Sequence, residues 1–189
     1  MIILVIATNN KDKLREFRNI LREYQIYSLK DKNINIDVVE DGETFLENAK
    51  KKALAIYDIV HEEVIADDSG LCIDVLNGYP GVNTHRFLGI HTTDEVRNQY
   101  LLKEVNKYDD RSAKVVCSLV YYDGKDMITS EGILEGKIAD EARGENGFGF
   151  DSIFEIPCGF TLAELGEDAK NIVSARGEAI KELKKKIER

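Results

Sequence analysis

The chain has 189 residues, of which 43% are hydrophobic and 32% charged, so it is long enough for one sizeable globular domain. Its formal net charge of -9 argues against a protein that coats duplex nucleic acid, because such a protein needs a broad basic face. The three cysteines are far apart and show no metal-ligand spacing. No apolar run approaches the roughly 20 residues of a membrane span, and the first residues lack the basic leader of a signal peptide. We therefore expect a cytoplasmic protein.

The N-terminal residues predict a strand, a polar turn and a helix. Residues 2–7 form a short apolar run typical of a buried strand, and the turn Thr8-Asn9-Asn10-Lys11-Asp12-Lys13 follows it. Apolar residues then recur at spacings of three and four through Tyr24, which indicates a helix. The free N–H groups of a first helical turn attract anions, and Lys13 could close on a phosphate. A capped helix with a solvated lysine is the alternative.

A second strand is expected at residues 34–39, and it ends at Glu40. Thr44 and Glu47 have the spacing of a capping box, which predicts a helix over residues 44–60. Lys52 lies on one face of that helix with Asn48, four residues earlier. If Glu40 meets another acid at a strand end, the two would supply oxygen ligands for a hard cation such as Mg²⁺. The alternative for Glu40 is an exposed acid in a loop.

The most unusual stretch is Asp67-Asp68-Ser69-Gly70, which follows the apolar run of residues 64–66. This pattern predicts a buried strand that brings acids to a sheet edge, followed by a tight turn. Neighbouring residues of a strand point to opposite faces, so the two carboxylates should have different roles. An ordinary turn is the alternative, because these residue types favour turns.

The second half predicts a helix after Thr93, a hairpin of strands near residues 113–121 and 127–134, and a glycine-rich loop at residues 144–151. In that loop Phe148 and Phe150 offer ring faces for stacking a base. Gly149 lets the backbone approach a flat ligand, and Asp151 offers a carboxylate. A loop held in the core by its two Phe residues is the alternative.

A strand near residues 153–157 and a short helix at residues 161–165 follow. Lys170 and Arg176 then flank Ser174, the expected cap of a final helix.

Together these stretches resemble the inosine/xanthosine triphosphate pyrophosphatase family, also called Ham1-like. The matching pieces run in order along nearly the whole chain and are Thr8 to Lys13, Thr44 to Ala49 with Lys52-Ala53, Ala66 to Leu71 followed by Gly78 to Val82, Phe148 to Asp151, and Lys170-Asn171 with Ser174 and Arg176-Gly177. Each motif is modest alone, but five in register make the resemblance specific.

The resemblance implies one α/β domain over residues 1–189, in which a long curved mixed sheet flanked by helices forms two lobes with a central cleft. It implies a homodimer that uses Mg²⁺ to hydrolyse ITP, dITP or XTP to the monophosphate and pyrophosphate. Glu40 and Asp68 would hold the metal, and Asp68 would activate the attacking water. Residues that would bind the substrate are Thr8, Asn9, Asn10, Lys11, Asp12, Lys13, Lys52, Ser69, Phe148, Gly149, Phe150, Asp151, Lys170, Ala175 and Arg176.

Two departures from the family pattern affect the expected base site. Ala175 stands where the family has a histidine, and Phe150 stands where it has a tyrosine. Nearby, His85 lies in a segment that also differs from the family. Two alternatives therefore remain: a pyrophosphatase for other modified or pyrimidine nucleotides, and a nucleotide-binding module without turnover. The retained acids Glu40 and Asp68 favour an enzyme, because binding alone needs no group that activates water.

Overall fold

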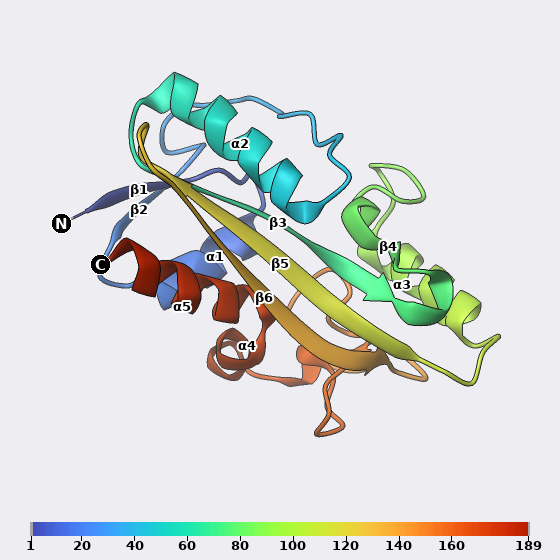
Figure 1. The fold of residues 1–189 in the computed structure, drawn as a ribbon. Helices are drawn as coiled ribbons and strands as arrows, with labels where there is room; N and C mark the ends of the chain where they lie inside the picture. Colours follow the sequence, from blue (N-terminus) through green and yellow to red (C-terminus); the bar gives the residue numbers. More distant parts are fainter. Residues whose placement is uncertain (1, 189) are drawn as a thin grey trace. The chain divides into compact units, whose positions relative to one another are not determined.

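The structure is a computed structural model that describes residues 2–188. Within these residues the strands are β1 (Ile3–Ile6), β2 (Gln25–Ser28), β3 (Val64–Ile73), β4 (Tyr79–Pro80), β5 (Ser112–Tyr122), β6 (Met127–Ile138) and β7 (Phe154–Glu155). The helices are α1 (Lys11–Ile20), α2 (Phe45–Val60), α3 (Asp94–Val105), α4 (Glu167–Val173) and α5 (Ala175–Ile187). Figure 1 shows these elements along the chain. None of the helices in this described range has the length and apolar content needed to cross a bilayer.

The chain forms two compact units. Unit 1 comprises the chain up to Asp68, Cys117–Gly132 and the residues from Arg176 onward, and unit 2 comprises Ser69–Val116 and Ile133–Ala175. The boundaries fall inside β3, β5 and β6 and after the first residue of α5, so each of these elements contributes residues to both units. The expectation of a single domain stays a prediction.

The strands form a mixed sheet in the order β2-β1-β3-β5-β6-β7, with β4 paired to β3. In unit 1, β1 runs parallel to both β2 and β3. In unit 2, β4 is antiparallel to β3, and β7 is antiparallel to β6. The mixed α/β class expected from the sequence is therefore confirmed.

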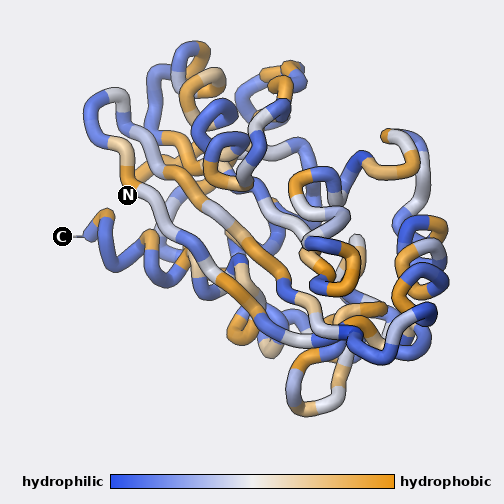
Figure 2. Tube along the Cα trace, turned by 45° about the vertical axis from the view of Figure 1, so that its right-hand side comes forward, coloured by the Kyte–Doolittle hydropathy of each residue, from blue (hydrophilic) through white to orange (hydrophobic). Residues whose placement is uncertain are grey.

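Helices of unit 1 cover its strands on both faces (Figure 1). On one face, α2 contributes Ala49, Ala53 and Ile56 to a buried cluster with Val5 of β1 and Val64 of β3. The other face carries α1 and α5. The C-terminal helix α5 alternates hydrophilic and hydrophobic positions around its turns (Figure 2), and its buried members include Ala179, Ile180 and Leu183. Such a stripe buries its apolar side against the sheet and leaves its charges in water.

The local cap signals correctly placed the starts of several helices. The Asn10 side chain caps α1, Thr44 caps α2 and Thr93 caps α3, each by accepting hydrogen bonds from backbone N–H groups of the first turn. The capping box before α2 differs from the expectation in one detail. The Glu47 carboxylate accepts from the backbone N–H of Glu43, not from that of Thr44.

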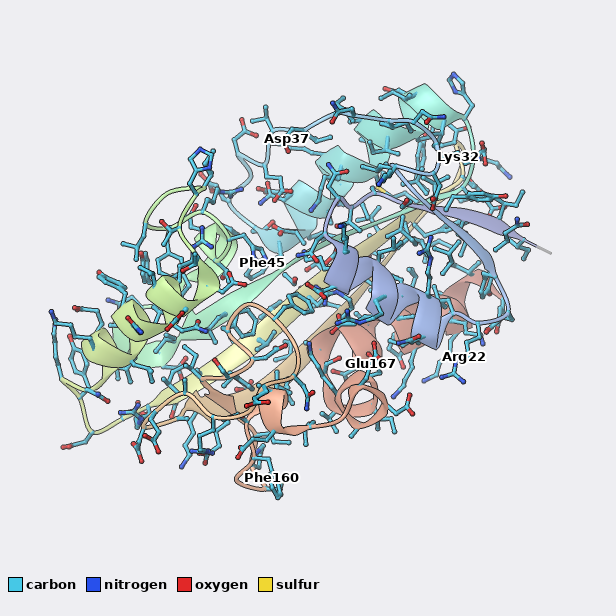
Figure 3. All side chains as sticks on the ribbon, turned by 180° about the vertical axis from the view of Figure 1, so that it is seen from behind. Arg22, Lys32, Asp37, Phe45, Phe160 and Glu167 are labelled. Atoms are coloured by element: carbon cyan, nitrogen blue, oxygen red, sulfur yellow. The ribbon has the colours of Figure 1, made fainter. Side chains whose placement is uncertain are left out.

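The predicted strand at residues 34–39 is wrong, because this segment has no strand assignment. Its burial nevertheless alternates as it would in a strand: Ile34, Ile36 and Val38 pack against the cluster of unit 1. Figure 3 shows the segment, marked by Lys32 and Asp37, running beside α2. Packing on a helix produced the period of two that we interpreted as a strand. Strand β2 and helix α4 were not predicted.

The predicted tight turn after Asp68 is also wrong. β3 continues without interruption from Val64 to Ile73, so the polar stretch lies in the middle of a strand. Asp67, Asp68 and Ser69 are all buried there. A buried charge is stable only when it is paired and hydrogen-bonded, so the two carboxylates require partners from neighbouring elements.

Candidate functional site

In unit 1 the turn between β1 and α1 brings the first group of predicted binding residues together. Asn10 Oδ1 accepts hydrogen bonds from the backbone N–H groups of Asp12 and Lys13, at 2.9 and 3.1 Å. Thr8 Oγ1 accepts from the backbone N–H of Asn10 at 3.1 Å. Thr8, Asn9, Asn10 and Lys11 line a pocket of about 440 Å³ together with residues between 28 and 35. The turn is thus a preformed polar wall at a helix start.

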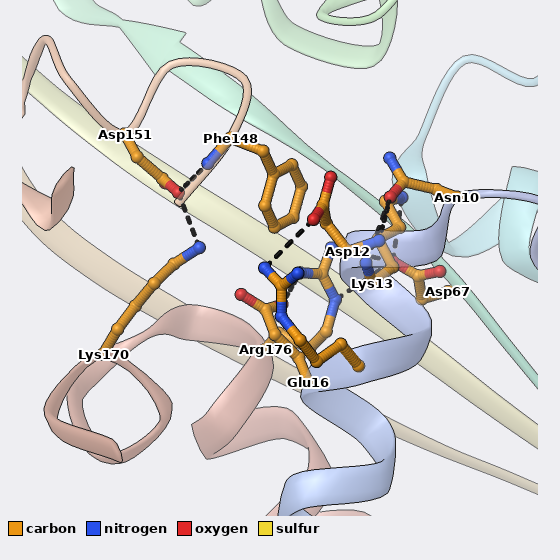
Figure 4. A network of polar contacts seen from close by, with 10 residues as sticks. Asn10, Asp12, Lys13, Glu16, Asp67, Phe148, Asp151, Lys170 and Arg176 are labelled. Atoms are coloured by element: carbon orange, nitrogen blue, oxygen red, sulfur yellow. Dashed lines mark hydrogen bonds and ion pairs between the residues drawn. The ribbon is translucent and has the colours of Figure 1, made fainter. Parts of the chain in front are cut away.

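Asp67 is the centre of a buried charge network in unit 1 (Figure 4). Its Oδ2 atom lies 3.0 Å from Lys13 Nζ and accepts hydrogen bonds from Arg176 Nη2 and Nε at 3.0 and 3.3 Å. Arg176 Nη1 also donates to the Glu16 carboxylate. Asp67, Glu16, Lys13 and Arg176 are all less than a tenth exposed. Two cations and two anions thus neutralise each other between α1, β3 and α5.

The charges of this network set the pKa values of its members. Burial by itself would raise the pKa of Asp67, but the charges of Lys13, Arg176 and Lys52 outweigh it and lower that pKa well below its usual range. Burial would likewise lower the pKa of the Arg176 guanidinium, but Asp67 and Glu16 raise it. Both groups therefore remain ionised, and the network is a set of buried ion pairs.

Asp68 faces α2, on the other side of the strand from Asp67. Asn48 Nδ2 of α2 donates to Asp68 Oδ2 at 3.0 Å, and both residues are buried. One turn further along α2, Lys52 Nζ lies 3.0 Å from Glu40 Oε1. The alternation expected of a strand is therefore observed, and the two acids contact different helices.

Burial raises the pKa of Asp68, although Lys52, the hydrogen bond from Asn48 and Lys13 act against the shift. The Glu40 charge also raises it, so the two carboxylates interact. For Lys52, burial would lower the pKa, but Asp67, Asp68 and Glu40 together raise it. Lys52 is thus a buried, protonated ammonium among carboxylates.

The carboxylates of unit 1 fit a metal that is shared with a substrate. Within the described part of the chain, no cluster of three or more His, Cys, Asp or Glu residues is arranged to hold a metal. Asp68 and Glu40 form a pair close enough for mutual repulsion. Mg²⁺ commonly takes one or two protein carboxylates and completes its shell with water and substrate phosphates. This donor set therefore fits Mg²⁺ better than zinc, which prefers nitrogen and sulfur ligands.

Unit 2 contains a separate polar group around Asp151 (Figure 4). Its Oδ2 atom accepts from Lys170 Nζ at 2.6 Å and from the backbone N–H of Phe148 at 2.8 Å. Lys170 Nζ also lies 4.3 Å from the centre of the Phe148 ring, a cation–π distance. Asp151 and Lys170 are buried, whereas Phe148, Gly149 and Phe150 are partly exposed. The structure thus assembles the glycine-rich loop and Lys170 into one group.

Two residues of unit 2 that were predicted to bind the substrate are buried in this structure. Ser69 follows Asp68 on β3 and is 7% exposed. Ala175, the first residue of α5, is 2% exposed, so its methyl group is a packing contact in this structure. The substrate contacts proposed for these residues stay predictions.

Sequence reasoning missed Glu16 and did not include Asn48 among the site residues. Glu16 lies three residues after Lys13 and directly before the buried Phe17, so a charge on the apolar side of α1 was a visible signal. Asn48 had been placed on one helix face with Lys52 but given no partner. Both were missed because their partners are distant in sequence: Glu16 and Arg176 are 160 residues apart.

Comparison with known proteins identifies the relatives of this chain. Residues 4–186 match the model of the Ham1 family. The dITP/XTP pyrophosphatase of Bacillus subtilis (strain 168) is 43% identical over 190 residues, which cover 97% of this chain and 96% of that protein. The dITP/XTP pyrophosphatase of Clostridium tetani (strain Massachusetts / E88) is 39% identical over 191 residues, covering 97% and 95%.

Solved structures agree with the sequence matches. The Ham1 protein of Staphylococcus aureus superposes with a TM-score of 0.89 at 37% identity, covering 98% of both chains. The HAM1 protein of Coxiella burnetii gives a TM-score of 0.90 at 36% identity, covering 99% of this chain and 98% of that one. The family resemblance inferred from the motifs and the fold class that it implied are therefore confirmed, and the chain belongs to the Ham1 family.

Proposed function

We propose that this protein is a nucleoside triphosphate pyrophosphatase that hydrolyses the non-canonical purine nucleotides ITP, dITP and XTP to the monophosphate and pyrophosphate. Relatives that match nearly the whole chain are named dITP/XTP pyrophosphatases. The observation that carries the proposal is the buried Asp68 carboxylate, which Asn48 holds and which lies near Lys52 and Glu40. A module that only binds nucleotides would not need this arrangement.

In the proposed reaction a water oxygen attacks the α-phosphorus, and the bond from that phosphorus to the pyrophosphate oxygen breaks. Asp68 orients the water and accepts one of its protons, which later passes to solvent. Lys13 and Lys52 supply positive charge that stabilises the phosphate oxygens as the negative charge moves to the leaving pyrophosphate. Thr8, Asn10 and Ser69 would hold the phosphates and sugar by hydrogen bonds.

Asp68 and Glu40 would hold Mg²⁺. When bound, the ion would supply Lewis-acid stabilisation of phosphate charge. Lys52 is already paired with Glu40 at 3.0 Å, so its ammonium is placed to help neutralise the phosphates beside the carboxylates.

We assign base recognition to the group in unit 2. Phe148 and Phe150 would stack on the purine, and Lys170 would donate to the 6-oxo group. The amino group of adenine is itself a donor and would present a donor to the Lys170 ammonium where an acceptor is needed. A buried donor left unpaired costs roughly 1–3 kcal/mol, which corresponds to tenfold or greater discrimination against adenine.

The second candidate is a pyrophosphatase for other modified or pyrimidine nucleotides. The observation that favours it is Ala175, which replaces the histidine expected at the base site and is buried in this structure. A smaller base would need fewer polar contacts from this position.

A nucleotide panel separates the candidates. Pyrophosphate release should be measured with Mg²⁺ for ITP, dITP, XTP, ATP, GTP, dUTP and dCTP. The proposal predicts a kcat/KM for ITP or XTP at least tenfold above that for ATP or any pyrimidine. A clear preference for a pyrimidine would support the second candidate, and binding without pyrophosphate release would indicate a non-catalytic module.

The cytoplasmic location and the homodimer inferred from the sequence belong to this proposal. The homodimer is what the family resemblance implies, and the cytoplasmic location is the expectation from the sequence. Size-exclusion chromatography coupled to light scattering would test the dimer directly, because one chain has a mass of 21.4 kDa.

A further inference from the structure

Helix α3 lies outside every motif that defined the proposed site, yet two of its side chains hold one residue of the glycine-rich loop. Asp94 Oδ2 accepts a hydrogen bond from the backbone N–H of Gly149 at 3.0 Å. Asn98 Nδ2 donates to the backbone carbonyl of Gly149 at 2.8 Å. Residues four apart lie on the same face of a helix, so consecutive turns of α3 contact both polar groups of a single residue.

The orientation of the Asn98 amide follows from this contact. A carbonyl oxygen only accepts hydrogen bonds, so the atom 2.8 Å from it must be the amide nitrogen. The same nitrogen lies 3.3 Å from Oγ of Ser152, the residue that follows Asp151 in the chain. Asn98 is 7% exposed, so water competes little for these bonds. The buried side chain of Asn98 thus hydrogen-bonds to Gly149 of the loop and to Ser152, the residue directly after it.

Asp94 is itself held in place. Arg97 Nη1 lies 3.4 Å from Asp94 Oδ1, and Arg97 Nε and Nη2 donate to the carbonyls of Phe87 and Gly89 at 3.1 and 2.8 Å. Arg97 is buried, so the guanidinium connects α3 firmly to the segment before it. The acceptor presented to Gly149 therefore has a fixed position, although half of the Asp94 side chain is exposed.

In the chain, Gly149 separates Phe148 and Phe150, the two residues assigned to base stacking. Its φ of 61° is in the left-handed region, which disfavours side chains, although a Cβ there would contact nothing within 4 Å. Asp151 fixes the preceding peptide by accepting from the N–H of Phe148. Asp94 holds the N–H of the following peptide and Asn98 holds the carbonyl of the one after it, so three consecutive peptides between Gly147 and Phe150 are fixed before any ligand arrives.

We propose that Asp94 and Asn98 are positioning residues that set base selectivity by holding Gly149, and through it the rings of Phe148 and Phe150. This inference rests on the proposed function, because it assigns base recognition to the loop. Preorganisation of a binding loop improves affinity for the correct ligand by removing the cost of ordering it during binding. Asp94 and Asn98 hydrogen-bond to the backbone of Gly149, so we expect their effect to be on binding of the base.

The test compares a ligand that has a base with one that has none. KM and kcat are measured for ITP and ATP, and inorganic pyrophosphate is used as a base-free inhibitor. Asn98→Leu keeps the size of the side chain but removes the donor. We expect the KM for ITP to rise roughly tenfold, since hydrogen bonds to Gly149 and Ser152 are lost. The preference for ITP over ATP should fall, while the inhibition constant of pyrophosphate stays within twofold.

Two further variants separate positioning from folding. Asp94→Asn keeps an acceptor for the Gly149 N–H and should retain most of the selectivity, whereas Asp94→Ala should lose part of it. Asp94 is half exposed, so these variants remain testable if Asn98→Leu does not fold. Gln99→Leu is the matched control on the same helix, because Gln99 is exposed and its side chain donates to Glu95.

A loss of stability alone has its own control. Ser130 donates a buried hydrogen bond to the Ala179 carbonyl in unit 1, so Ser130→Ala should lower the melting temperature without affecting the loop. The inference is overturned if Ser130→Ala loses selectivity as Asn98→Leu does. It is also overturned if Asn98→Leu and Asp94→Ala both keep wild-type selectivity, or if inhibition by pyrophosphate weakens as much as the KM for ITP rises. If the wild-type protein shows no preference for ITP, the proposed function itself fails, which the wild-type assay reveals first.

Discussion

Asp67 and Asp68 are consecutive residues of β3, and their pKa values are shifted in opposite directions. For Asp67, the opposing effect of burial is outweighed by Lys13, Arg176 and Lys52, which lower the pKa. For Asp68, burial prevails over Lys52 and Asn48 and raises the pKa. The strand points the two carboxylates to opposite faces, so Asp67 pairs with the buried cations Lys13 and Arg176, whereas Asp68 accepts a hydrogen bond from Asn48. We propose that this difference separates a structural acid, Asp67, from a reactive one, Asp68.

The first prediction contrasts their amide variants. Asp67→Asn removes the anion that pairs with Lys13 and Arg176, so the free energy of unfolding should fall by roughly 3–5 kcal/mol. Asp68→Asn should change it by about 1 kcal/mol or less, but should abolish pyrophosphate release from ITP. Urea denaturation and a pyrophosphate assay measure the two effects. Undiminished turnover by Asp68→Asn would refute its assignment as the catalytic residue.

The second prediction concerns Glu16, the buried partner of Arg176. Glu16→Ala leaves part of the guanidinium charge uncompensated, so we expect a loss of roughly 3–5 kcal/mol in the free energy of unfolding. Glu104→Ala is the matched control, because Glu104 pairs with the half-exposed Lys107 and should lose less than about 1 kcal/mol. An equal loss in the free energy of unfolding for both variants would show that the buried Glu16 pair stabilises the fold no more than the surface pair.

The third prediction tests the proposed metal ligands through Glu40. Glu40→Gln keeps the shape of the side chain but removes one negative charge, so the Mg²⁺ concentration for half-maximal activity should rise about tenfold or more. The neighbouring Asp41→Asn is the control, because Asp41 is 70% exposed and pairs with Lys51 on the surface. Titration calorimetry with Mg²⁺ and the monophosphate product provides a measurement that does not depend on turnover. An unchanged Mg²⁺ requirement in Glu40→Gln would remove Glu40 from the metal site.

The fourth prediction concerns thiol reactivity as a function of pH. Burial raises the pKa of the Cys117 thiol to about 12, whereas Cys158 is exposed. The thiolate is the reactive form. In the folded protein at pH 8.5, iodoacetamide should therefore alkylate Cys158 within minutes while Cys117 remains unmodified. In denaturant Cys117 should react at the rate of an ordinary thiol. Mass spectrometry of the two peptides would show this, and equal labelling in the folded state would contradict the burial of Cys117.

Local signals in the sequence were sufficient for several elements. Asn10, Thr44 and Thr93 were correct cap positions because a cap bonds to backbone groups only two or three residues away. The hairpin of β5 and β6 was predicted from the alternation of residues within each strand, which is also a local signal. The segment at residues 34–39 failed because alternating burial against α2 gives the same pattern as a paired strand.

The site divides in the same way. The sequence alone determined which residue types were available, namely an acid pair after an apolar run, lysines near helix starts and a glycine-rich aromatic loop, and it determined the family. Only the tertiary structure decided what these residues contact. Asp67 stays inside a continuous strand because Arg176, 109 residues away, and Lys13 compensate its charge. Gly149 is held by α3, which no motif connects to the loop. The stability of a buried charge or peptide group depends on its partners in space, and spacing along the chain does not specify them.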